Sequence, residues 1–218
     1  MTHLVDFGGE RLILHPWGAV YWERKDTLWI SDVHLGKISH FRKYGAAVPR
    51  KALHRNFERL NGLLKYFEPS TICFLGDLFH SHLNREWELF RQWVLNCPAT
   101  LQLVMGNHDI ISPIQYEKLG ITCVDFMETT PFLLTHHPQE SFEGYNICGH
   151  IHPAVRLQGA GRQRLRLPCF FMNGRQMILP AFGSFTGSHV MEASPGDRIF
   201  ALADNEIVAL TTAEGKSS

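Results

Sequence analysis

Short apolar runs recur along the earlier part of the chain, and each of them gives way to polar residues. The runs cover Leu28 to Ile30, Ile72 to Leu75, Leu101 to Met105, Phe132 to Leu134 and Tyr145 to Cys148. Apolar runs of this length, bounded by turn residues, are typical of buried strands in a parallel sheet. The sequence therefore predicts strands in these places.

The residues that follow the runs share carboxylate, amide and imidazole chemistry. They are Asp32 and His34, Gly76-Asp77, Gly106-Asn107-His108-Asp109, His136-His137, and Gly149-His150-Ile151-His152. Packing does not explain them, because a protein interior disfavours these residue types unless they are paired or bind a ligand. Parallel strands carry their carboxyl ends along one edge of a sheet, so we expect these side chains to converge on one site.

Helical spacing separates several of the runs. Pro49 suits the first turn of a helix whose apolar stripe is Leu53, Phe57, Leu60, Leu64 and Phe67. A second helix is predicted from Arg85 to Asn96, with Asn84 as its N-cap. Ser112 as a cap, Pro113 in the first turn and Gly120 at the end predict a short third helix.

This alternation of strand and helix is the order of βαβ units, which build a parallel sheet. Before it, residues 4–14 and 19–30 predict two hairpins. After His152 the pattern changes to strands at residues 155–157, 164–172, 177–182, 199–202 and 207–210. These strands predict antiparallel pairing in a second sheet that packs on the first, with its edge near the site.

Length and charge set broad limits. The chain has 218 residues, enough for one α/β domain with a substantial core. We expect a single domain over residues 1–218, with residues 213–218 as a disordered tail. Lys and Arg together number 21, as do Asp and Glu, so the net charge is zero and composition alone identifies no partner.

Cysteine usage indicates a reducing compartment. The chain has five cysteines without a C-x-x-C motif, and Cys73, Cys123, Cys148 and Cys169 lie in apolar runs. This favours buried free thiols and disfavours a zinc ribbon. No basic segment precedes an apolar stretch near the start, and no run approaches the length of a membrane span. We therefore expect a cytoplasmic protein without a membrane partner.

The predicted site has a mixed oxygen and nitrogen donor set without thiolate. Such a set suits Mn²⁺, Fe²⁺ or Zn²⁺ better than Ca²⁺ or a structural zinc ion. More than four donors are available, which predicts two ions. Two ions about 3.5–4 Å apart lower the pKa of a bound water toward about 7 and clamp both oxygens of an in-line displacement, as in phosphoester hydrolysis.

A covalent mechanism has little support. No Gly-x-x-x-x-Gly-Lys loop, Gly-x-Ser-x-Gly elbow or cysteine with a paired base stands out. His108, in contrast, follows a metal donor and precedes Asp109. An imidazole oriented by a carboxylate can donate a proton to a leaving alkoxide, an effect worth about 10²–10⁴ in rate. We therefore expect a catalytic role for His108, with Asp109 as its partner.

In this order the motifs resemble the calcineurin-like metallophosphoesterase superfamily, and they span residues 32–152. The resemblance implies a four-layer αββα sandwich with two central mixed sheets. It implies that Asp32, His34 and His152 bind one metal, that Asn107, His136 and His150 bind the other, and that Asp77 bridges them. His136 is preferred to His137 as the donor because it is nearer the strand end. His137 would then either support the metal ligands from outside or face the substrate.

The branch of the superfamily can be narrowed. Residues 75–80 are similar to the second motif of a nuclease branch, in which a histidine at the place of His80 supports the site. Residues 32–37, 41–42, 48–49 and 179–187 resemble the bacterial ligase-associated DNA damage response endonucleases. That resemblance implies Mn²⁺-dependent endonuclease cleavage of DNA in repair, with a DNA ligase, a helicase and an exonuclease-like protein as partners. Ser188 stands where that family usually has a second glycine, so the resemblance does not determine the conformation of the turn at this position.

Two groups of cations are candidates for substrate contact. Lys37, Arg42 and Lys43 follow the first motif and either meet phosphates or belong to an ordinary solvated loop. Alternating arginines at 162, 164 and 166 either contact nucleic acid or protect an edge strand. The same metal core would also serve a small-molecule phosphodiesterase or pyrophosphatase acting on nucleotides or related diphosphates. An inactive scaffold is disfavoured, because every expected donor is present.

Overall fold

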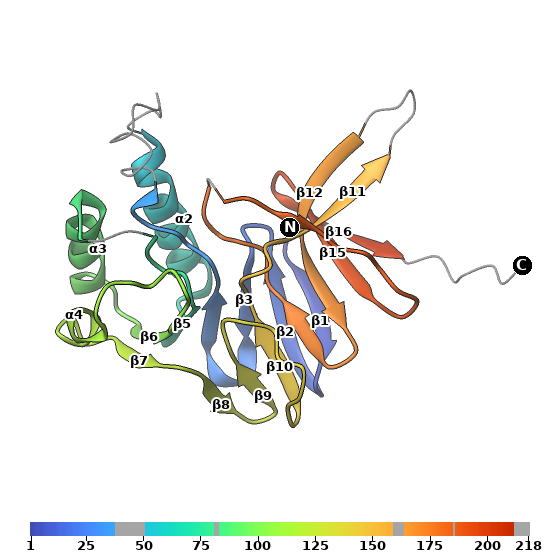
Figure 1. Cartoon of the computed structure of the whole chain (residues 1–218), viewed down its shortest axis with the longest axis horizontal. Coiled ribbons are helices and arrows are strands. Elements are labelled where there is room, and N and C mark those ends of the chain that lie inside the picture. The colour runs from blue at the N-terminus through green and yellow to red at the C-terminus, as the bar shows by residue number, and fades with distance from the viewer. Residues whose placement is uncertain (38–50, 81–82, 159–163, 185, 212–218) are drawn as a thin grey trace, which may run out of the picture.

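A computed structural model describes residues 1–37, 51–80, 83–158, 164–184 and 186–211 of the chain. Three cations singled out above, Arg42, Lys43 and Arg162, lie outside these residues, as does the predicted tail at 213–218. The described residues form two large sheets, with three α-helices on one side of the first (Figure 1).

The first sheet has seven strands in the order β1-β2-β3-β4-β5-β6-β7. Their bounds are β1 (His3–Phe7), β2 (Glu10–His15), β3 (Ala19–Trp22), β4 (Thr27–Ile30), β5 (Thr71–Leu75), β6 (Thr100–Val104) and β7 (Thr122–Val124). A short 3₁₀ helix, Glu23–Lys25, joins β3 to β4. Strands β1 to β4 pair antiparallel, which confirms both predicted hairpins, and β4 to β7 pair in parallel.

The α-helices are α2 (Lys51–Phe67), α3 (Arg85–Leu95) and α4 (Pro113–Glu117). In α2 the predicted stripe positions Phe57 and Leu60 are buried. The predicted cap of α3 is confirmed, because the Asn84 side chain accepts a hydrogen bond from the Glu86 N–H at 2.7 Å. Ser112 is at the predicted N-cap position of α4 and Pro113 is in its first turn as predicted, although the Ser112 side chain makes no capping hydrogen bond.

The second sheet follows the order β14-β11-β12-β13-β10-β9-β8, with β15 paired to β12 and β16 to β15. Its strands are β8 (Met127–Thr129), β9 (Phe132–Leu134), β10 (Tyr145–Cys148), β11 (Pro153–Gln158), β12 (Arg164–Asn173), β13 (Gln176–Ile178), β14 (His189–Val190), β15 (Arg198–Ala203) and β16 (Glu206–Thr211). Strand β10 pairs in parallel with both β9 and β13, whereas β12 pairs antiparallel with β11, β13 and β15.

The predicted strand at residues 177–182 ends early, at Ile178. Pro180 lies two residues further on and has no N–H to donate to a neighbouring strand. The chain then returns to the first sheet, where the Phe182 N–H donates to the Ser31 carbonyl at 2.9 Å and the Gly183 N–H to that of Asp32 at 3.0 Å. This return segment therefore braces the turn that carries the first motif.

Alternation along the central strands divides the core into two layers. Leu28 and Phe74 pack with the helices, whereas Trp29 and Cys73 pack against residues of the second sheet such as Phe132. The layers thus run helices, first sheet, second sheet, and the two central mixed sheets confirm the predicted fold class. After α4 the described chain contributes strands and no helix, so these residues form no fourth, outer helix layer.

None of the described helices combines the length and the apolarity that a bilayer crossing needs. The five cysteines are free thiols. Cys73, Cys148 and Cys169 are buried as predicted, but Cys123 is only partly buried, because it lies on β7 at the edge of the first sheet.

Candidate metal centre

The polar residues predicted from the sequence meet where strands of both sheets end. Strands β4, β5 and β6 of the first sheet and β9 and β10 of the second run in parallel within their sheets, so their carboxyl ends lie along common edges. Main-chain hydrogen bonds join neighbouring turns: the His34 N–H donates to the Asp77 carbonyl at 2.9 Å, and the Gly149 N–H to that of His136 at 3.0 Å. The site is therefore assembled on backbone that is already ordered.

The backbone of the site is unusual. Among the described non-glycine residues with positive φ, five belong to the predicted donors: Asp32, His34, Asp77, His150 and His152, with φ from 49° to 67°. Residues with a Cβ rarely adopt this left-handed conformation, and each instance costs on the order of 1–3 kcal/mol. The surrounding hydrogen bonds have to offset that cost, and such strain concentrates at functional sites.

At two of the motif glycines, a residue of the other sheet lies too close to the backbone for any side chain to fit. A Cβ at Gly76, where φ is +81°, would overlap the His136 imidazole. A Cβ at Gly149 would overlap the Ser31 hydroxyl and the Asp32 carboxylate. The glycines let a residue of one sheet approach the backbone of the other.

A first group of donors consists of Asp32, His34 and His152. The His152 Nε2 lies 3.0 Å from the Asp32 Oδ1 and 3.3 Å from the His34 Nε2, and the His34 Nε2 lies 3.9 Å from the same Oδ1. This buried oxygen makes no well-aligned hydrogen bond to any described residue. A cation between these atoms would satisfy it.

The second oxygen of Asp32 is held by hydrogen bonds. It accepts from the Ser31 hydroxyl at 2.5 Å and from the His150 N–H at 3.0 Å, across the two sheets. The sequence interpretation missed Ser31, whose only signal is a small polar residue at the end of an apolar run. The bond fixes the carboxylate so that its other oxygen points into the site.

Asp77 lies between the two halves of the site. Its Oδ2 is 3.6 Å from the His34 Nε2, and its Oδ1 is 3.4 Å from the His136 Nε2. The Oδ1 also accepts a hydrogen bond from the main-chain N–H of His108 at 2.9 Å. Asp77 is therefore within reach of both groups of imidazoles.

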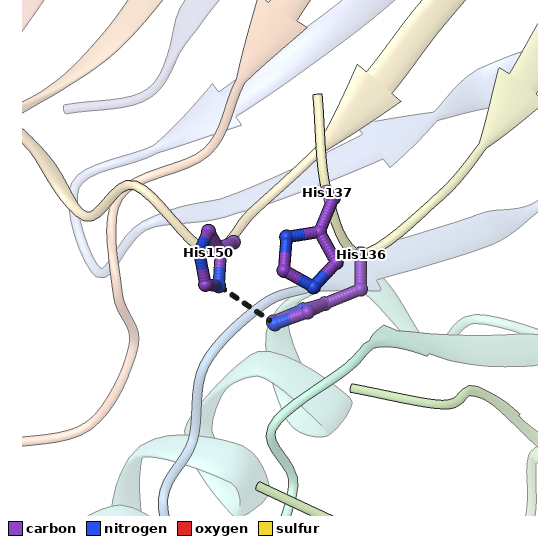
Figure 2. Close-up of side chains that lie close together, drawn as sticks. All are labelled: His136, His137 and His150. Carbon is purple, nitrogen blue, oxygen red and sulfur yellow. Dashed lines mark hydrogen bonds between the residues drawn. The ribbon is translucent and has the colours of Figure 1, made fainter. Parts of the chain in front are cut away.

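A second group surrounds His136, which is buried at the end of β9. Its Nε2 lies 3.1 Å from the Asn107 Oδ1 and 3.2 Å from the His150 Nδ1. Its Nδ1 lies 2.9 Å from the Leu75 carbonyl, which can only accept, so the proton sits on Nδ1 and the lone pair of Nε2 faces the site. The neighbouring His137 is exposed and lies against His150 (Figure 2).

Charge states at neutral pH suit a cation. Burial lowers the pKa of His34 to about 3, and burial together with neighbouring imidazoles lowers the pKa of His150. Burial would raise the pKa of Asp32, but His152 and Ser31 hold it below its usual value. Burial opposes protonation of His152, yet Asp32 raises its pKa, so a metal ion there would compete with a proton for the imidazole. Anionic oxygens and neutral imidazoles are the ligands that first-row divalent ions accept, and the residues present fit ions of this kind.

His80 and His108 lie beside these donors. Their ring centroids are 4.5 Å apart, and the His108 ring lies 5.7 Å from that of His34. His108 is exposed, so its imidazole is accessible to a substrate. Within the described residues the Asp109 oxygens bond main-chain N–H groups and not the His108 ring, so the structure shows no direct contact for the expected partnership.

Asp109 acts on the backbone instead. Its two oxygens accept from the N–H groups of Phe79 and Gly106, both at 2.9 Å, and thereby tie the turn after β6 to the turn after β5. Burial raises the pKa of Asp109 to about 6, although both hydrogen bonds oppose that rise. Lys37 is one of the predicted substrate contacts. Burial lowers its pKa, and the nearby Asp77 carboxylate opposes that fall.

Comparisons with known proteins identify a family and a similar solved structure. The family model described as calcineurin-like phosphoesterase matches residues 26–177. The chain is similar to the crystal structure of the Pseudomonas putida nuclease MPE, at 27% identity and a TM-score of 0.82, over 96% of this chain and 100% of that one. A search of curated proteins gave no significant match.

Two other solved structures are less similar to this chain. A protein of unknown function, AQ665 from Aquifex aeolicus, is 24% identical over 58% of this chain and 78% of its own, with a TM-score of 0.42. Yfce, a phosphoesterase from E. coli, is 16% identical over 84% of this chain and 96% of its own, with a TM-score of 0.41. The match to the family model over most of the chain shows that this protein belongs to the calcineurin-like phosphoesterase family, and it is a metal-dependent phosphoesterase.

Proposed function

We propose that the chain is a two-metal phosphodiesterase that cleaves DNA. In this proposal Asp32, His34 and His152 hold one cation, Asn107, His136 and His150 hold the other, and Asp77 lies between them. The observation that carries the proposal is the convergence of these seven side chains from two sheets. It is supported by the similarity, over almost the whole chain, to a solved structure that is itself a nuclease.

The cations are proposed to be Mn²⁺, with Fe²⁺ or Zn²⁺ as alternatives that the same donors accept. When bound, two divalent ions supply Lewis-acid stabilisation of the phosphoryl oxygens and an acidified water. The protein contributes their spacing, because Asp77 reaches His34 with one oxygen and His136 with the other.

His108 is proposed to donate a proton to the leaving oxygen. It sits in a turn whose main-chain N–H is fixed on Asp77, while its exposed ring faces the open side of the site. The adjacent ring of His80 is proposed to position that of His108. Asp109 is proposed to hold the turn in place through its two main-chain hydrogen bonds. Proton donation of this kind contributes about 10²–10⁴ in rate.

A polyanionic substrate is supported by arginines on the hairpin of β11 and β12, which projects from the body of the molecule (Figure 1). Arg156 and Arg166 lie directly opposite each other, so they share one face, and Arg164 follows on the same face. All three are exposed, and none forms an ion pair within the described residues. Like charges placed opposite each other destabilise a hairpin, and phosphates would relieve this repulsion.

The hairpin also starts at the site, because β11 begins one residue after His152. A strand of DNA bound at the metals could therefore continue along it, and His137 and Lys37 are proposed to contact the substrate nearer the cations. The family resemblance supports a role in bacterial DNA repair in the cytoplasm, beside a ligase, a helicase and an exonuclease-like protein. These last assignments are part of the proposal.

The direct test is incubation with Mn²⁺ and circular single-stranded DNA, with Asp77→Asn purified in parallel as the control. We expect the protein to nick the circle and the variant to leave it intact, since a substrate without ends reports only endonuclease action. Hydrolysis of bis-p-nitrophenyl phosphate with intact DNA would overturn the DNA assignment in favour of a small-molecule diester or diphosphate.

The arginine face is tested by the salt dependence of binding to single-stranded DNA. Replacing both Arg164 and Arg166 with Gln should lower the slope of log K against log salt by about 0.7 for each phosphate that the variant no longer neutralises. Arg91→Gln, at an exposed arginine of α3, serves as the matched control and should leave the slope unchanged. An unchanged slope in the double variant would show that these arginines do not contact phosphates and would favour the alternative that they protect an edge strand.

A further inference from the structure

Three histidines form a cluster at the ends of β9 and β10. One ring nitrogen from each of His136, His137 and His150 lies within 4.8 Å of the corresponding atoms of the other two. The ring centroids of His137 and His150 are only 3.9 Å apart, and that of His136 lies 4.8 Å from His137 and 5.0 Å from His150. Figure 2 shows the His137 ring next to the other two.

Within the part of the chain that the structure describes, the His137 ring has no hydrogen-bond partner that explains its position. Among the described residues, the imidazole nitrogens of His137 make no hydrogen bond, although its carbonyl accepts two, from Thr135 and Gln139. Both carbonyl contacts fix the backbone of His137 and thereby direct the ring. His136 and His137 also line a cavity of about 320 Å³, so open space adjoins these two members of the cluster.

The donors around this cluster differ from those of the first group. The first group has two imidazoles with the Asp32 carboxylate, whereas His136, His137 and His150 bring three imidazoles to a position where the Asn107 and Asp77 oxygens also lie 3.1 and 3.4 Å from His136. Imidazole nitrogen suits Zn²⁺, Fe²⁺ and Ni²⁺, and carboxylate and carbonyl oxygens suit the harder Mn²⁺ and Mg²⁺. A third imidazole should therefore shift this position toward Zn²⁺ or Fe²⁺ relative to the first.

We propose that His137 is an additional ligand of the cation held by His136 and His150, which raises the affinity of this position for Zn²⁺ or Fe²⁺, the alternatives to Mn²⁺ given above. The inference rests on the metal-binding part of the proposed function and does not depend on DNA as the substrate. It assigns to His137 a role in metal selection in place of the substrate contact proposed above.

The test is competition between metals. The protein, the variants His137→Gln and His137→Ala, and the control His189→Gln at an exposed histidine would be dialysed against equal Mn²⁺ and Zn²⁺ and analysed for bound metal. We expect the protein and the control to hold one Zn²⁺ that resists exchange. Both His137 variants should bind that Zn²⁺ about 10–100-fold more weakly, by analogy with the loss of groups that support a metal ligand.

A second readout counts ligands directly. In protein loaded with Co²⁺, each coordinated histidine with a protonated remote nitrogen gives one strongly shifted proton resonance, and His137→Gln should lose one of them. Unchanged Zn²⁺ affinity and an unchanged count in folded variants would overturn the role of His137. Failure of the unaltered protein to bind two ions would instead overturn the proposed function, so the two failures are distinguishable.

Discussion

The two sheets supply different chemistry to a single site. The first sheet provides both carboxylates and the amide, with one imidazole: Asp32, Asp77, Asn107 and His34. The second sheet provides imidazoles alone: His136, His137, His150 and His152. Asp32 and Asp77 are 0% and 1% exposed, so the first sheet carries buried negative charge. The second sheet brings donors that are neutral when they bind a metal.

The difference shows how such a site can be built. Burying an anion costs several kcal/mol unless a cation or hydrogen bonds compensate it. In the first sheet that cost is offset by the Ser31 hydroxyl and the main-chain N–H groups that reach Asp32 and Asp77. The imidazoles of the second sheet bury no negative charge, and two of them are held by main-chain carbonyls, that of His136 by Leu75 and that of His152 by Gly187.

The largest effect should come from removing charge at the boundary between the sheets. Asp77→Asn is expected to lower both metal content and diester hydrolysis, the latter by about 10³-fold or more, because two-metal stabilisation of several kcal/mol is lost. His150→Gln, which removes a donor without a charge, should weaken one cation by only about 10–100-fold. Metal content and steady-state rates measure both effects. Equal losses in the two variants would show that the carboxylate and the imidazole contribute equally.

The next effect separates chemistry from metal binding. His108→Ala should slow hydrolysis by about 10²–10⁴ while keeping both ions, because only its main-chain N–H bonds Asp77. Rates and metal content measured on one preparation give the answer. Loss of metal in parallel with activity would contradict the proposed division of roles.

The close contact between the two sheets can be tested by adding a methyl group where they meet. Gly149→Ala should lower the free energy of unfolding by about 1–3 kcal/mol, because the new Cβ would overlap Ser31 and Asp32. Gly187→Ala places the same methyl group in open space near His152 and should stay within about 0.5 kcal/mol. Urea unfolding of the metal-free proteins measures both, and similar values would show that the sheets do not meet as closely as described.

The smallest effect concerns a histidine of the first sheet that lies away from the site. Burial lowers the pKa of His15 to about 4, and its Nδ1 accepts the Trp17 N–H at 3.1 Å. The unfolded chain therefore takes up this proton first as the pH falls below 6.5. Stability is unaffected above that value and is lost below it, by at most about 1.4 kcal/mol per pH unit and less after solvent screening.

His15→Gln should accordingly flatten the fall in unfolding free energy between pH 6.5 and about 4. His54→Gln, at an exposed histidine of α2, is the control and should keep the slope of the unaltered protein. Urea titrations at several pH values give the slopes. An identical slope in the His15 variant would show that this residue does not control acid stability.

Much of the site could be predicted from the sequence because its signals are local. The apolar runs and the donors after them are adjacent in the chain, and His136 could be preferred to His137 by its place at the strand end. The cap at Asn84 and the inward stripe of α2 are equally local, since both depend on residues within a few positions of each other.

The sequence by itself determined which residues enter the site and in what order, because strand periodicity and residue chemistry act over a few neighbours. Only the tertiary structure decided how they meet. The bond from the His150 N–H to Asp32 joins residues 118 positions apart. The main-chain role of Asp109 depends on the pairing of β5 with β6, and the place of the His137 ring beside His150 depends on the pairing of β9 with β10. Such contacts leave no local pattern, because their geometry is set by layers of the fold that are remote in sequence.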